Sequence, residues 1–211
     1  MSPSLDLMEF VEKKILPRYT QFDAAHNMQH VTSVIRRSLA IARHTTADIN
    51  MVYVVAAYHD LGLCGPRAVH HITGAKILAT DQRLQRWFTP TQIEIMRQAV
   101  EDHRASASHA PRSIYGRIVA EADRDLRPDV VFQRAIDFGL DNYPQLTEEQ
   151  QWQRFREHMT EKYSATGYIQ LWIEGSENHH HLEELRKIIK DEQQLHSHFT
   201  RLYSKAKEKR F

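Results

Sequence analysis

Hydrophobic residues recur at helical spacing along most of the chain, and no segment shows the strict alternation that predicts a strand. Residues 30–45 place apolar side chains on one helix face, at Val31, Val34, Ile35, Leu39 and Ala42. Residues 48–62 are apolar nearly all round, which predicts a central buried helix. Asp48 or Asn50 would cap its start, and Gly62 would suit its end.

The same periodicity predicts helices along the rest of the chain. A short helix within residues 6–19 is expected to stop at Pro17. Thr89 and Gln92 have the spacing of a capping box, with Pro90 at the first helical position. The remaining predicted helices are 70–79, 89–103, 112–123, 129–140, 147–164 and 182–210. The pattern predicts an all-α protein in which residues 1–211 form one compact domain.

Composition narrows the class of protein. The chain has 211 residues, a formal net charge of +1 and one cysteine, Cys64. The charge balance indicates neither a nucleic-acid nor a membrane partner. A single cysteine allows no intramolecular disulfide, no apolar segment approaches the ~20 residues that span a bilayer, and the first residues lack a signal pattern. We therefore expect a cytoplasmic protein, and the sequence indicates no particular oligomeric state.

Five residues with metal-binding chemistry fall near helix ends. His30 begins one predicted helix, and His59 and Asp60 close the central one. His103 continues the apolar face of its helix, and Asp123 lies one turn after an apolar residue. A carboxylate in such a place is costly unless it is paired or bound to a metal. Helical bundles commonly build metal sites from side chains that converge in this way.

Each of these residues also has a purely structural interpretation. The chain holds 14 histidines, so chance pairs at helical spacing are expected. His103 taken alone fits a hydrogen-bonded core residue, and Asp123 could pair with Arg117 or Arg124. The histidines at 179–181 are interpreted as the solvated start of a helix rather than a metal-binding tract.

Five segments in order resemble the HD-domain superfamily of metal-dependent phosphohydrolases: "HNMQH", "AAYHDLG", "HHITGAKIL", "EDHR" and "EADRD". The resemblance covers about residues 20–130, and the whole chain is similar to a bacterial group of these proteins. It implies an HD-domain helical bundle, with an additional helical extension over about residues 131–211.

The resemblance also implies a set of site residues. His30, His59, Asp60 and Asp123 match the ligands of one metal ion, and His59 and Asp60 are the signature pair at the catalytic centre. In dinuclear members the signature aspartate bridges to a second ion that two further histidines bind. Here these are His103 and His70, with His71 as the alternative to His70. His26 is placed as a residue that supports a ligand or contacts substrate.

This ligand set suits one or two divalent ions among Mn²⁺, Fe²⁺, Co²⁺, Ni²⁺, Zn²⁺ and Mg²⁺. A metal-bound water, with its pKa lowered towards ~7, would be the nucleophile. The expected substrate is a nucleotide or other small phosphate ester. Arg67, Arg104 and Arg124 lie next to proposed ligands and would bind its phosphate, although helix-end arginines are also common in solvent.

Two other functions fit the same residues. One is an HD-type di-iron oxygenase, and the other is a regulatory module that binds metal or nucleotide without turnover. The basic segment "KAKEKR" near the end of the chain is too short to indicate nucleic-acid binding and fits a solvated helix end.

Overall fold

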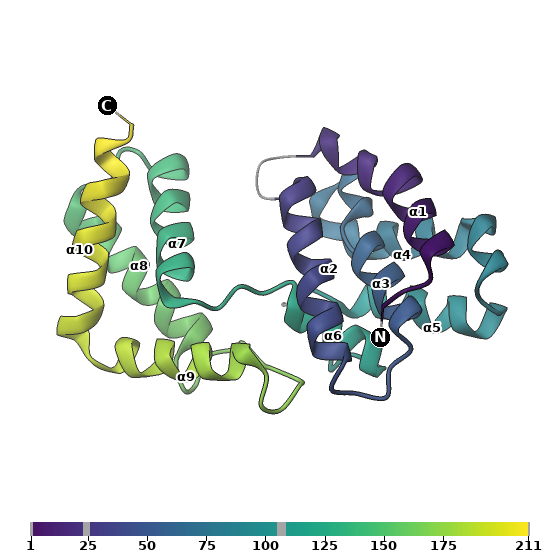
Figure 1. Ribbon diagram of the computed structural model, residues 1–211. Coiled ribbons are helices and arrows are strands. Elements are labelled where there is room, and N and C mark those ends of the chain that lie inside the picture. Colours follow the sequence, from purple (N-terminus) through teal and green to yellow (C-terminus); the bar gives the residue numbers. More distant parts are fainter. Residues whose placement is uncertain (1, 23–25, 105–108, 211) are drawn as a thin grey trace. The chain divides into compact units, whose positions relative to one another are not determined.

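The computed structural model describes residues 2–22, 26–104 and 109–210 (Figure 1). All regular secondary structure in these ranges is helical, which confirms the all-α prediction. The α-helices are α1 (Leu5–Lys14), α2 (Met28–Ala42), α3 (Ile49–Tyr58), α4 (His70–Thr80), α5 (Pro90–Asp102), α6 (Ile114–Ala122), α7 (Pro128–Asn142), α8 (Glu148–Tyr163), α9 (Glu177–Lys190) and α10 (Glu192–Glu208). The 3₁₀ helices are η1 (Leu16–Gln21), η2 (Leu61–Cys64), η3 (Arg67–Val69) and η4 (Gln82–Arg86).

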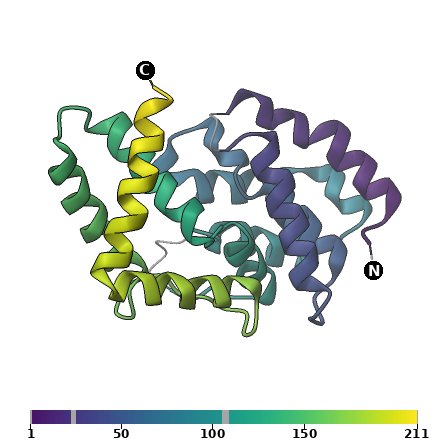
Figure 2. The ribbon, with the colours of Figure 1, turned by 60° about the vertical axis from the view of Figure 1, so that its left-hand side comes forward.

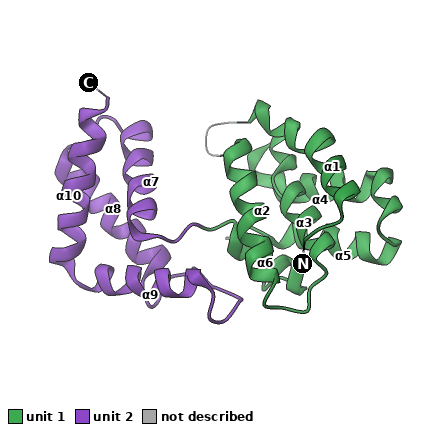
Figure 3. Cartoon of the chain, in the orientation of Figure 1, with its two compact units in different colours: residues 1–124 green, residues 125–211 purple. Residues whose placement is uncertain are grey.

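The chain divides into two compact units, residues 1–124 and 125–211 (Figure 3). The division lies close to the limit near residue 130 that the sequence suggested for the motif-bearing core. The packing of both parts into a single domain stays a prediction. Within the described ranges, no helix combines the length and apolarity needed to cross a membrane.

Helix α3 is the centre of the first unit, and α2, α5 and α6 pack around it (Figures 1 and 2). Every residue from Met51 to Tyr58 is buried, as the apolar run predicted. Asp48 caps this helix by accepting hydrogen bonds from the backbone N–H groups of Asn50 and Met51. Helix α4 packs mainly against α5 and against η2, the turn that follows α3. The buried helix therefore provides a fixed base for the residues at its end.

Other predicted helix signals have mixed outcomes. Thr89 and Gln92 form the expected capping box, with Pro90 at the start of α5. The first helix ends at Lys14, earlier than predicted, and Pro17 lies within η1.

The role predicted for Gly62 is wrong. Helix α3 ends at Tyr58, and Gly62 lies in η2 without a positive φ angle. A β-carbon at this position would overlap the carbonyl oxygen of His70 and lie 2.5 Å from the backbone nitrogen of Gly74. A β-carbon on Gly74 would in turn lie 3.1 Å from the carbonyl oxygen of His59. The two glycines therefore let the segment after α3 lie directly against the first turns of α4.

The second unit packs α7, α8 and α10 around aromatic side chains that include Phe132, Phe155 and Phe199. The single helix predicted over residues 182–210 is wrong: α9 and α10 are separate, and Figures 1 and 2 both show the chain turning sharply between them. Asp191 lies at the break and accepts hydrogen bonds from the N–H groups of Gln193 and Gln194, so it begins a new helix.

We predict that Gly62→Ala lowers the free energy of unfolding by about 3 kcal/mol or more, because the added methyl group meets backbone that cannot rotate away. Gly65→Ala is the matched control, since its nearest neighbour would be the Gly62 carbonyl oxygen at 3.7 Å, an ordinary contact. Denaturant unfolding of both variants measures the difference. Equal stability of the two would contradict the close approach described here.

Candidate metal centre

The six residues proposed as ligands all lie at helix ends of the first unit. The cap residue Asn27 fixes the start of α2 by accepting hydrogen bonds from the N–H groups of Gln29 and His30. The six positions are His30 in the first turn of α2, His59 and Asp60 directly after α3, His70 at the start of α4, His103 directly after α5 and Asp123 directly after α6. The fold brings all six together, as two groups that share one residue.

The first group contains His30, His59, Asp60 and Asp123. Nε2 of His30 lies 3.2 Å from Oδ1 of Asp123 and 3.4 Å from Oδ2 of Asp60. Nε2 of His59 lies 3.6 Å from Oδ1 of Asp123 and 3.2 Å from Oδ2 of Asp60. The two Nε2 atoms are 3.3 Å apart. Asp123 therefore faces histidines, and the alternative pairing with Arg117 or Arg124 is not needed to explain its position.

The second group contains Asp60, His70 and His103. Oδ1 of Asp60 lies 3.5 Å from Nε2 of His70 and 3.6 Å from Nε2 of His103, and these two nitrogens are 3.2 Å apart. Asp60 thus directs one carboxylate oxygen towards each group. One carboxylate could therefore supply a ligand atom to each group.

Backbone carbonyl groups orient three of the four imidazoles. Nδ1 of His59 lies 2.8 Å from the Ala56 oxygen, and Nδ1 of His103 lies 2.5 Å from the Val100 oxygen. Nδ1 of His70 lies 2.8 Å from the backbone carbonyl oxygen of Arg67 in η3. A neutral imidazole that donates from Nδ1 carries a lone pair on Nε2. The lone pairs therefore converge, and they repel one another unless a cation lies between them.

The spacing of the ligand atoms fits a metal ion. Nitrogen and oxygen atoms that bind one tetrahedral ion at about 2.0–2.2 Å lie roughly 3.3–3.6 Å from one another. The separations given above for the two groups are 3.2–3.6 Å. Hydrogen-bonded Nδ1 atoms are also the usual support of metal-binding histidines. Both groups could therefore hold a divalent ion.

Electrostatics at the first group also favour positive charge. Burial alone would raise the pKa of Asp60, but the charge of His59 and hydrogen bonds from the surrounding imidazoles hold that pKa far below its ordinary value. Burial is likewise outweighed at Asp123, where the two histidines hold the pKa well below the usual range. Burial lowers the pKa of His30 and His59, yet the aspartates outweigh it and raise both pKa values. The two carboxylates therefore favour positive charge beside them, carried by protonated imidazoles when no metal is bound or by a metal ion that replaces the protons.

Tyr19 supports the site, and the sequence analysis did not find it. Its side chain is fully buried, and its hydroxyl donates to the Ala57 carbonyl oxygen at 3.0 Å. The Tyr19 hydroxyl oxygen in turn accepts a hydrogen bond from the backbone N–H of Asp60 at 3.4 Å. A side chain from η1 thus satisfies backbone groups at the end of α3, exactly where the helix has no partners of its own. No local sequence signal marks a contact across 41 residues.

The structure separates His70 from His71. His70 contributes its Nε2 to the second group, and His71 does not belong to either group. Nδ1 of His71 is buried and has no hydrogen-bond partner among the described residues. Burial lowers the pKa of His71, and the charge of nearby Arg104 lowers it further. The geometry therefore favours His70 over His71 as the ligand of the second group, and His70 was the residue that the sequence analysis preferred.

Two candidate substrate-binding residues lie beside each other near the first group. Nη2 of Arg67 lies 3.4 Å from Nε2 of His26, and the His26 ring lies against that of His30, with centroids 5.8 Å apart. Arg67 is exposed. A charged guanidinium is thus linked through one histidine to a proposed ligand.

The other two candidates follow ligands in the chain. Arg104 donates from Nη1 to the Ala68 carbonyl oxygen at 2.9 Å, which ties the end of α5 to η3. Its remaining N–H groups have no protein acceptor among the described residues. Arg124 is half-buried and directly follows Asp123. Contact of these arginines with a phosphate stays a prediction.

Two known proteins are similar to parts of this chain. A crystal structure of a predicted HD superfamily hydrolase from an uncultured Thermotogales bacterium is similar with a TM-score of 0.49 and 21% identity, over 74% of this chain and 84% of that one. The tRNA (cytidine(56)-2'-O)-methyltransferase of Thermoplasma volcanium is 30% identical over 118 residues. That match covers 52% of this chain, which spans only about a third (35%) of the methyltransferase.

The HD-domain family model matches residues 27–127. This range contains all six residues of the two groups, from His30 to Asp123. Residues 27–127 of this chain are therefore a domain of the HD superfamily.

Proposed function

We propose that the first unit is a metal-dependent phosphohydrolase that acts on a nucleotide or another small phosphate ester. One observation supports this proposal above the others: two groups of ligand atoms share the carboxylate of Asp60. An incomplete ligand set would favour a regulatory module, whereas all six proposed ligands converge here. Two adjacent sites joined by one carboxylate are typical of enzymes that displace a group at phosphorus.

The donor atoms narrow the choice of cation. His30, His59, Asp60 and Asp123 would hold one ion, and Asp60, His70 and His103 would hold the other. Four imidazole nitrogens favour Mn²⁺, Fe²⁺, Co²⁺, Ni²⁺ or Zn²⁺ over Mg²⁺, which prefers oxygen ligands. When bound, such ions would supply an activated water as nucleophile and positive charge beside the phosphoryl oxygens.

The residues of the chain itself would position the substrate. The backbone contacts of His59, His70 and His103 fix the imidazoles before anything binds, so no reorientation is needed. Arg104 and Arg67 carry permanent charge close to the ligands and can donate paired hydrogen bonds to a phosphate. Arg124 and His26 complete this set of substrate contacts in the proposal.

We predict that Asp60→Asn lowers the metal content and reduces kcat/KM by at least about 10³-fold, or about 4 kcal/mol, because one side chain serves both groups. Asp81→Asn is the matched control: Asp81 is also a largely buried carboxylate, but it accepts from Tyr58 and Arg83 outside the site. Metal analysis of protein purified without chelator, followed by phosphate release from nucleotides and general phosphate esters, provides the test. A metal-free wild type, or full turnover by Asp60→Asn, would rule the proposal out.

We also predict that Arg104→Ala leaves the metal content unchanged and lowers kcat/KM by about 10²-fold, or about 2.7 kcal/mol. Arg104→Lys should recover only part of this loss, because it keeps the charge but not the planar fork. Arg83→Ala, at an exposed arginine that pairs with Asp81, is the control. If Arg104→Ala stays within about twofold of the wild type, Arg104 serves only to tie α5 to η3.

A further inference from the structure

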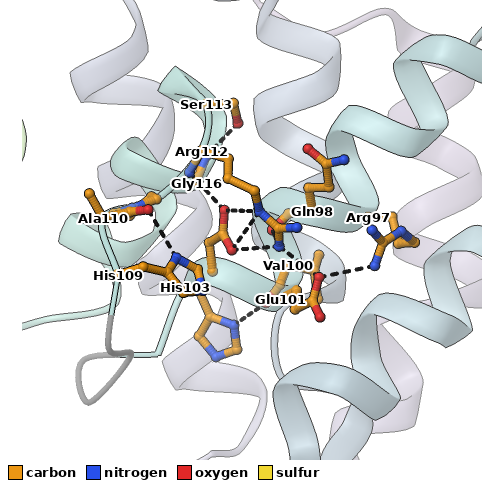
Figure 4. Close-up of polar contacts among 12 residues, drawn as sticks. Arg97, Gln98, Val100, Glu101, His103, His109, Ala110, Arg112, Ser113 and Gly116 are labelled. Atoms are coloured by element: carbon orange, nitrogen blue, oxygen red, sulfur yellow. Dashed lines mark hydrogen bonds and ion pairs between the residues drawn. The ribbon is translucent and has the colours of Figure 1, made fainter.

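An ion pair between a buried carboxylate and an exposed arginine closes the last turn of α5. The Asp102 carboxylate is fully buried and accepts from Nε of Arg112 at 3.0 and 3.1 Å and from Nη2 at 2.6 Å. It also accepts from the backbone N–H of Arg112 at 2.8 Å. Nη2 of Arg112 further reaches Glu101 at 2.6 Å and the Gln98 carbonyl oxygen at 3.5 Å (Figure 4). One arginine thus holds three residues of the same turn.

This turn carries a ligand of the second group. His103 directly follows Asp102, and its Nδ1 takes its orientation from the Val100 carbonyl oxygen at 2.5 Å. Figure 4 shows His103 and Arg112 at the same end of α5. The last carbonyl groups of a helix lack intrahelical partners, so this end would otherwise fray. The direction of the His103 imidazole therefore depends on how firmly the turn is held.

We propose that Arg112 and Asp102 are positioning residues that hold His103 in place and thereby control occupancy of the second group independently of the first. The inference rests on the proposed function, since it assigns a metal ion to that group. His30, His59 and Asp123 come from α2, α3 and α6, and none of them lies on the turn that Arg112 holds. Loosening this turn moves one ligand of the second group and none that belongs only to the first.

A purely structural role predicts a different result. An ion pair that only stabilises the unit would, when weakened, lower the affinity of both groups together or of neither. Arg97 offers a matched control, because it lies on the same helix and pairs with Glu94 and Glu101 but not with Asp102. Arg97→Lys thus alters the same charge network without touching the contact that the inference requires.

The experiment uses Mn²⁺ as the probe and the full chain as wild type, Arg112→Lys, Asp102→Asn and Arg97→Lys. Arg112→Lys keeps the charge and loses the forked contact, and Asp102→Asn keeps the size and loses the charge. Calorimetric titration of metal-free protein should show two ions in the wild type. In Arg112→Lys and in Asp102→Asn, we expect the affinity for one ion to fall about 10-fold or more. The affinity for the other ion should stay within about twofold of the wild-type value. Arg97→Lys should match the wild type.

A second measurement does not depend on metal. In the metal-free protein, imidazole ¹⁵N spectra should show His103 protonated at Nδ1 in the wild type and in Arg97→Lys, and averaged between tautomers in Arg112→Lys. His59 should be unchanged in all of them. Equal loss of both ions, loss of neither, or an unaltered His103 tautomer would overturn the inference. If the wild type binds no Mn²⁺, Zn²⁺ replaces it as the probe. A wild type that binds neither ion would refute the proposed function, and the spectra would still test the positioning of His103.

Discussion

The central constraint in this protein is the convergence of electron pairs on buried nitrogen and oxygen atoms. Four imidazole nitrogens and two carboxylates meet at the ends of separate helices, and pairs of Nε2 atoms lie as close as 3.2 Å. Such atoms repel one another when they are dry and carry no cation. The packing of the apolar helix α3 and its neighbours holds the residues in place despite the free-energy cost of this repulsion. The positions of the surrounding helices follow from the need to deliver one ligand each.

Close backbone approach makes this convergence possible. The turn after α3 and the first turns of α4 meet through Gly62 and Gly74, with no side chain between them. This contact brings the segment of Asp60 against the segment of His70. Tyr19 also holds the end of α3, and Arg112 holds the end of α5. The site is thus assembled from rigid helix ends, and side chains such as Tyr19 and Arg112 hold these ends in place.

The sequence predicted the parts of this site that depend on local pattern. Helical periodicity located α2, α3 and α5, and the order of the motifs identified the six residues that converge. It could not choose between His70 and His71 from spacing alone, because both lie in one helical turn and only their rotation about the axis distinguishes them. Tyr19 and Arg112 were missed because their contacts cross loops without periodic signal. The break at Asp191 was missed because apolar spacing continues through it, although an aspartate followed by "EQQ" is a recognisable helix start.

The contribution of η1 also bears on what counts as the working unit of this family member. The family match begins at residue 27, whereas Leu7, Val11, Ile15 and Tyr19 lie before it and are fully buried. A fragment cut to residues 27–127 would keep all six converging residues, yet it would open an apolar face to water and leave the Ala57 carbonyl without its hydroxyl partner. Such a fragment would be prone to self-association. The range that the family model matches is therefore shorter than the packed unit, and moving the site to another chain would require residues before 27 as well.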